Sequence, residues 1–168
     1  MKLKMKKKII LLLSAMSICL AAEPCTVNAS QLEYYFSSED NTTVEYLPNG
    51  DYITEIMSVE NTIQPYTSTP SSKTASKTIQ YTDASNKKCW SYKLTATFSY
   101  NKTTSKCTEA SCSFISYSDN WILSSQSAKK SGDTAIGNVT AKRKVDGIVL
   151  NTIRREIKLK CSASGAIS

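Results

Sequence analysis

The residues with the clearest potential for chemistry are four cysteines, Cys89, Cys107, Cys112 and Cys161. In an exported chain an even number of cysteines predicts disulfide bonds, and four cysteines allow three connectivities. A zinc site is the alternative, since the spacing of Cys107 and Cys112 is permissible for one. The other two cysteines have no neighbouring cysteine, however, and the chain contains no histidine. We therefore expect disulfides and no bound metal.

The pairing of these cysteines stays open at this stage. A bond between Cys107 and Cys161 would close a loop of about 55 residues and stabilise the fold by roughly 4 kcal/mol. Alternation predicts Cys89 on the polar face of its strand and far along that strand from Cys112. A second bond between these two is therefore uncertain.

The absence of histidine excludes several reaction classes. Ser-His-Asp and Cys-His catalysis, the usual general base near neutral pH and most catalytic zinc sites all need imidazole. A pair of carboxylates of the glycosidase type needs two acids at a fixed separation. The acids available in the second half of the chain fall mostly in predicted turns: Asp83, Glu109, Asp119, Asp133, Asp146 and Glu156. We expect no enzymatic activity and no cofactor.

One group of basic residues has a spacing that suggests binding. Alternation places five cations on the outward side of the last predicted hairpin: Lys142, Lys144, Arg154, Lys158 and Lys160. Such a face can hold polyanions, such as wall polymers, acidic glycans or nucleic acid, by neutralising their charge. The alternative is that these lysines only protect strands from edge-to-edge aggregation. Trp90 is expected in the core, whereas Trp121 is open to either a sugar-stacking or a core role.

Residues 1–29 have the three parts of a bacterial secretory signal. Five lysines precede an apolar run from Ile9 to Ala22, which is too short to anchor a membrane protein. Small side chains favour cleavage between Ala29 and Ser30, and Cys19 and Cys25 would leave with the signal. We expect a secreted, extracellular protein with no stable membrane insertion.

Residues 30–73 are predicted to be an acidic, mostly disordered arm and linker, with a short hairpin at residues 46–59 as the alternative. Residues 30–72 contain seven acidic residues and no lysine or arginine. Residues 61–73 combine two prolines with serines and threonines, a composition typical of linkers. An acidic arm ahead of a basic domain predicts either mutual attraction or separate partners.

Residues 74–168 are predicted to form an all-β domain. In Cys89–Tyr100 the large apolar side chains alternate with polar ones, which predicts a strand with one buried face. Residues 75–81 should pair with it through the turn at 82–87, and shorter strands are expected at 113–118 and 121–127. About seven strands favour a two-layer antiparallel β-sandwich of immunoglobulin-like architecture.

The register of the last hairpin follows from its apolar positions. A two-residue turn at Asp146-Gly147 would oppose the apolar face of one strand to the polar face of the other. A three-residue loop, Asp146-Gly147-Ile148, instead pairs small residues with large ones. The expected pairs are Ala141 with Ile153, Gly137 with Ile157 and Ala135 with Leu159. Arg143 and Arg155 then fall on the apolar side, at its rim or where the alternation breaks.

Five sequence blocks carry a resemblance to a known family: YLPNGDYIT, CWSYKLTATFSYN, SKCTEASCSFISYSDNW, SQSAKKSGDTA and IKLKCSASGAIS. Over residues 46–168 the chain resembles a secreted family of unknown function from Gram-positive gut bacteria. The resemblance implies an exported domain with Cys107 and Cys161 as the recurrent cysteine pair, and Cys89 and Cys112 as variable additions. It implies no activity.

Two functions are consistent with these features. The first is a non-enzymatic β-sandwich, secreted or associated with the cell wall, that interacts with an anionic wall polymer, a glycan or a host surface. The second is a secreted effector, bacteriocin-like or directed at a host, whose acidic arm masks the basic face until it is removed.

Overall fold

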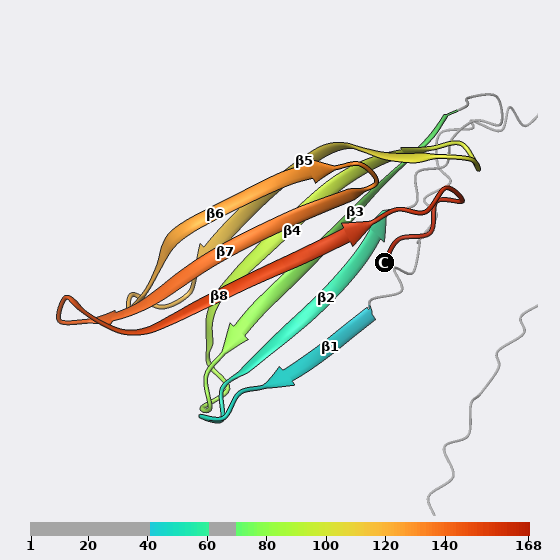
Figure 1. Cartoon of the computed structure of the whole chain (residues 1–168). Helices are drawn as coiled ribbons and strands as arrows, with labels where there is room; N and C mark the ends of the chain where they lie inside the picture. The colour runs from blue at the N-terminus through green and yellow to red at the C-terminus, as the bar shows by residue number, and fades with distance from the viewer. Residues whose placement is uncertain (1–40, 61–69) are drawn as a thin grey trace, which may run out of the picture. The chain divides into compact units, whose positions relative to one another are not determined.

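The computed structural model describes residues 41–60 and 70–168, and every regular element in them is a β-strand (Figure 1). In the described residues there is consequently no helix with the length and apolar character needed to cross a membrane. The eight strands are β1 (Asn41–Tyr46), β2 (Tyr52–Glu60), β3 (Ser71–Thr82), β4 (Lys88–Tyr100), β5 (Ser105–Ser116), β6 (Trp121–Ser131), β7 (Thr134–Val145) and β8 (Ile148–Lys160).

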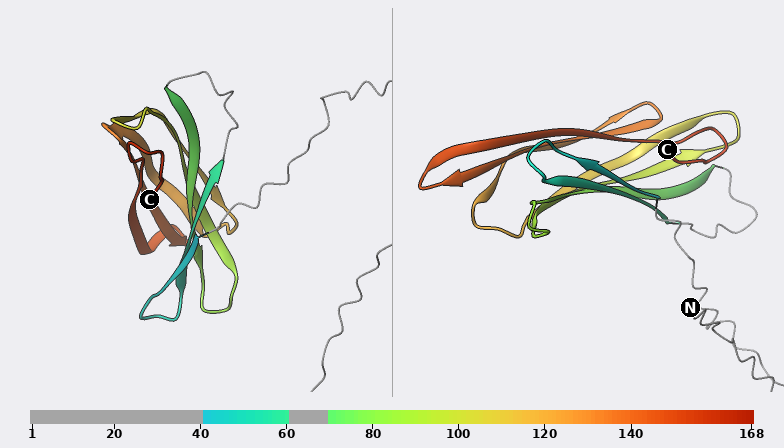
Figure 2. Two further views of the ribbon diagram at one scale, coloured as in Figure 1. Left: turned by 90° about the vertical axis from the view of Figure 1, so that its right-hand side faces the viewer. Right: turned by 90° about the horizontal axis from the view of Figure 1, so that it is seen from below.

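The strands form two antiparallel sheets, one ordered β1-β2-β3-β4-β5 and the other β6-β7-β8. Their inner faces share one core of buried side chains, with the two sheets as its two layers (Figure 2). The predicted all-β, two-layer antiparallel fold is confirmed. In both sheets each strand lies beside its neighbour in sequence, without the Greek-key connections of immunoglobulin domains. The immunoglobulin-like part of the prediction is therefore not confirmed.

Residues 41–60 differ from the sequence expectation of a mostly disordered arm. They form β1 and β2, and β2 pairs with β3 along its whole length from Tyr52 to Glu60. The reason is local: Ile53 is buried in the core, and the Asp51 carboxylate accepts hydrogen bonds from the Tyr81 hydroxyl and the Ala84 backbone. The folded part thus begins well before residue 74. Residues 71–73 of the predicted linker also belong to a strand, since they open β3 and pair with β4. The predicted signal, residues 30–40 of the arm and residues 61–69 of the linker lie outside the described residues.

The strand predicted at Cys89–Tyr100 is present as β4. Its alternate residues Trp90, Tyr92, Leu94 and Phe98 are completely buried, so the predicted apolar face is the core face. Cys89 is an exception to the alternation. Pairing of β3 with β4 passes from Tyr81–Trp90 to Thr82–Lys88, which leaves Cys89 unpaired in a bulge and buried. The expectation that Cys89 lies on the polar face is wrong for this reason.

The β7–β8 hairpin has the predicted register along most of its length. Ala141 pairs with Ile153, Gly137 with Ile157 and Ala135 with Leu159. The predicted three-residue loop is wrong, however.

The chain uses the two-residue turn, with Asp146 at φ 50° and Gly147 at φ 80°, the combination that a type I′ turn requires. Pairing then jumps from Lys144–Val149 to Arg143–Asn151, so that Leu150 is the extra residue of a bulge. This bulge, rather than a longer loop, restores the favourable register.

Gly137 allows the two sheets to approach closely at the centre of the core. A Cβ atom at this position would lie 2.6 Å from the Tyr92 hydroxyl and 3.2 Å from a Leu94 methyl group. The Tyr92 hydroxyl is held in place, since it donates a hydrogen bond of 2.9 Å to the Ser127 carbonyl of β6. The Tyr92 hydroxyl of β4 can therefore reach the backbone of β6 only because residue 137, which lies beside its path, is a glycine.

We predict that Gly137→Ala destabilises the protein by about 1–3 kcal/mol, the usual cost of an added methyl group in a packed core. The added methyl group must displace the Tyr92 ring and weaken its bond to Ser127. Asn138→Ala, on the outward side of the same strand, is the matched control and should change the free energy of unfolding by less than about 0.5 kcal/mol. Urea denaturation measures both, and equal stabilities of the two variants would contradict the prediction.

Candidate functional site

The outward side of the three-stranded sheet carries the predicted cations. On β7 and β8 they alternate with the core residues Ala141, Ile157 and Leu159, so they project away from the other sheet. Arg154 is opposite Thr140 and Lys142 is opposite Thr152, which makes these two cations diagonal neighbours. We call the five residues the basic face: Lys142, Lys144, Arg154, Lys158 and Lys160.

Acidic neighbours compensate one end of the basic face. The Lys158 Nζ atom lies 3.0 Å from a carboxylate oxygen of Glu156. The Lys160 Nζ atom lies 3.7 Å from a carboxylate oxygen of Asp133, in the β6–β7 turn. Within residues 41–60 and 70–168, the other three members of the face form no ion pair. The excess positive charge therefore gathers towards the β7–β8 turn.

Sequence reasoning missed a further cation on this side, Lys129 of β6. Its position is opposite Ile136, and Ile136 is opposite Lys158, so the three form one row across the sheet. The strand expected at 121–127 ends before Lys129, whereas β6 continues to Ser131. Extending the strand by two residues would have placed Lys129 on the outward side.

The two arginines expected on the apolar side both lie at its rim. Arg155 lies beside a groove of about 420 Å³ between β1, β2 and β8, where its guanidinium bonds the Glu45 carboxylate at 2.9 Å. Its Nε atom is buried without a partner among the described residues. Arg143 lies beside a second cavity of about 160 Å³, together with Asp51 and Trp121.

The carboxylates beside these cavities are already engaged. Glu45 is bound by Arg155, and Glu55 by Lys77 at 3.0 Å. Asp51 accepts the Tyr81 hydroxyl. Among the described residues, moreover, no three cysteine or acidic side chains cluster as metal ligands.

The four cysteines are free thiols in this structure, so the expected disulfide is not formed in it. Burial raises the pKa of Cys89, Cys107 and Cys161 above the ordinary thiol value. Cys112 is opposite Leu94, five residues along β4 from Cys89, a separation of roughly 16 Å at the rise of a strand. Cys89 and Cys112 are therefore too far apart to bond to each other.

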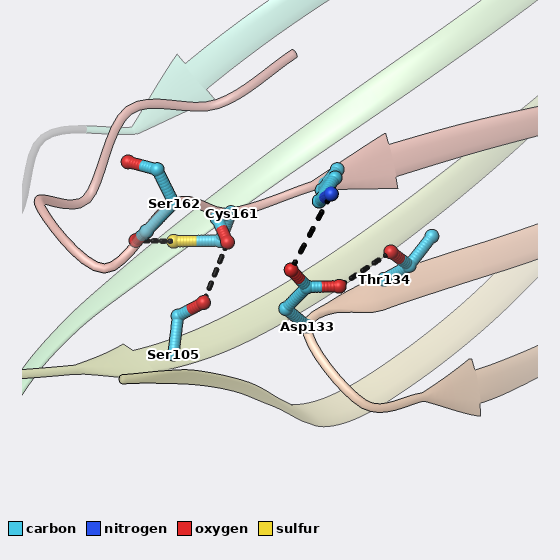
Figure 3. Close-up of polar contacts among 6 residues, drawn as sticks. Ser105, Asp133, Thr134, Cys161 and Ser162 are labelled. Carbon is cyan, nitrogen blue, oxygen red and sulfur yellow. Dashed lines mark hydrogen bonds and ion pairs between the residues drawn. The ribbon is translucent and has the colours of Figure 1, made fainter. Parts of the chain in front are cut away.

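Cys107 and Cys161, in contrast, both form backbone hydrogen bonds with the turn between β6 and β7. The Cys107 amide donates to the Gly132 carbonyl at 2.8 Å, and the Cys161 amide donates to the Asp133 carbonyl at 3.0 Å. Ser105, two residues before Cys107 on the same face of β5, donates from its hydroxyl to the Cys161 carbonyl at 2.6 Å (Figure 3). Both thiols thus lie at one end of the core.

Trp121 is buried, so of its two possible roles, stacking on sugars or packing in the core, it has the second. Its ring centroid lies 4.9 Å from that of Tyr81 and 6.2 Å from that of Trp90, and only 4% of the residue is exposed. A stacking surface for sugars at this residue is therefore not available. The basic face is the grouping of predicted site residues that the fold brings together on an accessible surface.

Comparison of the chain with protein-family models, with curated proteins and with solved structures finds no match.

The buried hydroxyl and thiol groups predict a loss of stability at alkaline pH. Burial raises the pKa of Tyr92, and burial together with the Asp51 carboxylate raises that of Tyr81. Such groups stabilise the fold fully below their unfolded pKa, about 8.5 for cysteine and about 10 for tyrosine. Above it the unfolded chain releases protons that the folded chain retains, so the free energy of unfolding falls as pH rises.

Urea midpoints between pH 7 and pH 11 in reducing buffer test this expectation. Tyr92→Phe should flatten the decline above about pH 10, because it removes one buried hydroxyl. Tyr117→Phe, at a half-exposed ring, should leave the profile unchanged. A midpoint that stays constant across the range would refute the expected proton linkage.

Proposed function

We propose that the protein is an exported, non-enzymatic binding protein that holds polyanionic surfaces through its basic face. The observation that carries the proposal is the gathering of Lys142, Lys144 and Arg154 on the outward side of a sheet whose inner side forms the core. None of these three forms an ion pair with an acidic side chain among the described residues. Cations fixed on a rigid sheet attract repeated phosphates, sulfates or carboxylates by neutralising their charge.

The ligand classes that fit are an anionic wall polymer, an acidic glycan or another polyanion on a host surface. Each offers negative groups at regular spacing, and a flat sheet can contact several of them at once. The lysine-rich leader at residues 1–29, with a cleavage site between Ala29 and Ser30, supports export to the compartment where such polymers occur.

An effector with an acidic masking arm is the alternative function. One observation favours contact between arm and sheet: Glu45, in the acidic segment, bonds Arg155 of β8. Arg155 lies beside the groove between the sheets, however, and not on the basic face. Since β1 and β2 belong to the five-stranded sheet, trimming the whole arm would damage the fold, and a test of masking must cut before Asn41.

The expected bond between Cys107 and Cys161 belongs to the same proposal, because an exported chain meets thiol–disulfide oxidases. The two thiols would give two electrons and two protons to the oxidase disulfide and form one bond. The shared contact with Gly132 and Asp133 supports this pairing, as it holds both cysteines at one end of the core. Closing the bond requires the two side chains to move towards each other from the present structure.

We predict that secreted protein alkylated under denaturing, non-reducing conditions carries label only on Cys89 and Cys112. Intact mass and peptide mapping measure this directly. After reduction, all four cysteines of the second half should be labelled, and the protein should lose up to roughly 4 kcal/mol of stability. Label on Cys107 or Cys161 before reduction would contradict the pairing.

The binding function is tested with residues 30–168 and an immobilised polyanion such as heparin. We expect the logarithm of the affinity to fall linearly with the logarithm of salt concentration, as counterions are released. The double variant Lys142→Gln/Arg154→Gln should weaken binding and reduce that slope by about two, one for each lost contact.

The matched control is Lys93→Gln/Lys106→Gln, which removes two exposed lysines from the five-stranded sheet. It carries the same net charge as the test variant and should retain most of the affinity. Equal losses in the two variants would mean that total charge, and not the basic face, controls binding. Affinity that does not respond to salt would reject the proposal itself.

A further inference from the structure

The tip of the β7–β8 hairpin exposes three successive aliphatic side chains. Ile148 is 65% exposed, Val149 45% and Leu150 59%. In the regular part of β7 buried and half-buried side chains alternate, but on β8 the bulge at Leu150 interrupts the alternation here. Apolar side chains that gather on a surface usually mark a site of interaction.

The turn itself does not require these aliphatic residues. Asp146 and Gly147 supply the two positive φ angles of the turn, and the backbone pairs of Lys144 with Val149 and Val145 with Ile148 close the hairpin. Polar residues with high strand propensity, such as threonine, would serve the backbone equally well. Neither the turn nor the core therefore explains why this end of the hairpin is apolar.

The tip extends past the neighbouring strand. Trp121, the first residue of β6, is opposite Arg143, so the pairs at Lys144 and Val145 lie beyond the end of β6 (Figure 1). The view from below shows the same projection of the hairpin (Figure 2). The aliphatic side chains can therefore reach a flat surface before the rest of the sheet does.

Cations surround this apolar tip. Lys142, Lys144 and Arg154 belong to the uncompensated end of the basic face, and Arg143 is also exposed. Exposed aliphatic side chains flanked by lysine and arginine are the combination that binds the interface of an anionic bilayer. The aliphatic groups enter the boundary between headgroups and acyl chains, and the cations contact lipid phosphates.

We propose that the β7–β8 tip binds anionic lipid bilayers, with Ile148, Val149 and Leu150 seated in the interface. The inference rests on the proposed function and deepens it, because lipid phosphate becomes the anion that the basic face recognises. A soluble wall polymer or glycan would engage the cations but would leave the aliphatic side chains in water. The lipid interface accounts for both features of the hairpin.

One residue opposes the interaction and limits its depth. Asp146 carries a negative charge at the turn, where an anionic surface repels it. The tip therefore stays at the level of the headgroups. Asp146→Asn removes this charge while keeping a residue type that tolerates positive φ.

The test uses residues 30–168 and sedimentation with two kinds of vesicle, phosphatidylcholine alone and phosphatidylcholine mixed with phosphatidylglycerol. We expect binding to the anionic vesicles only. Ile148→Ser/Leu150→Ser should lower the partition coefficient at least tenfold, and Asp146→Asn should raise it severalfold. Ile115→Ser, at an aliphatic residue of β5 that is 52% exposed, is the matched control and should leave binding unchanged.

Heparin affinity of the same variants separates this inference from the proposed function. The serine double variant should bind heparin as the unmodified protein does, because its cations are intact. If the unmodified protein binds heparin but not vesicles, the lipid inference is overturned and the proposed function stands. If the unmodified protein binds neither heparin nor vesicles, both proposals are rejected. Vesicle binding that the serine variant retains, or a dimer in sedimentation analysis that this variant abolishes, would also overturn the inference.

Discussion

The contact of Trp121 with Tyr81 and Trp90 is the interaction on which the two-layer arrangement depends. Tyr81 and Trp90 stack within the five-stranded sheet at 5.6 Å, and Trp121 is the residue with which the three-stranded sheet begins. By packing on this pair, Trp121 fixes where the chain turns from the first sheet to the second. Aromatic side chains bury the largest apolar areas, so the contact anchors one end of the core.

The two sides of the three-stranded sheet carry different kinds of side chain. The inner side of β7 carries the small residues Ala135, Gly137 and Ala141, which leave room for the large side chains of β4. Because side chains alternate, the residues between these core positions on β7 and β8 point outward, and lysine and arginine occupy several of them. The same period of two that builds the core thus collects the cations on one surface.

Sequence alternation predicted the fold and the basic face where the strands are regular. It failed at Cys89 and at the β7–β8 turn, because a bulge inserts one residue and reverses the faces, and nothing in the period signals it. Residues 41–60, predicted to be mostly disordered, form β1 and β2 because Ile53 packs in the core and Asp51 binds Tyr81, contacts with distant residues that no local pattern reports. The ion pair of Lys160 with Asp133 joins residues from separate elements, so it could not be predicted from a local sequence pattern.

The sequential order of the strands bears on how the chain acquires its structure. Within the described residues every sheet neighbour is also the next element along the chain, so each strand has its partner as soon as the following strand is synthesised. Few strands wait for distant ones, which keeps loop-closure costs low and shortens the exposure of unpaired edges. The contact of Glu45 with Arg155, which spans 110 residues, can form only when β8 arrives. This contact therefore joins the first and the last of the described strands only after all eight of them have been made.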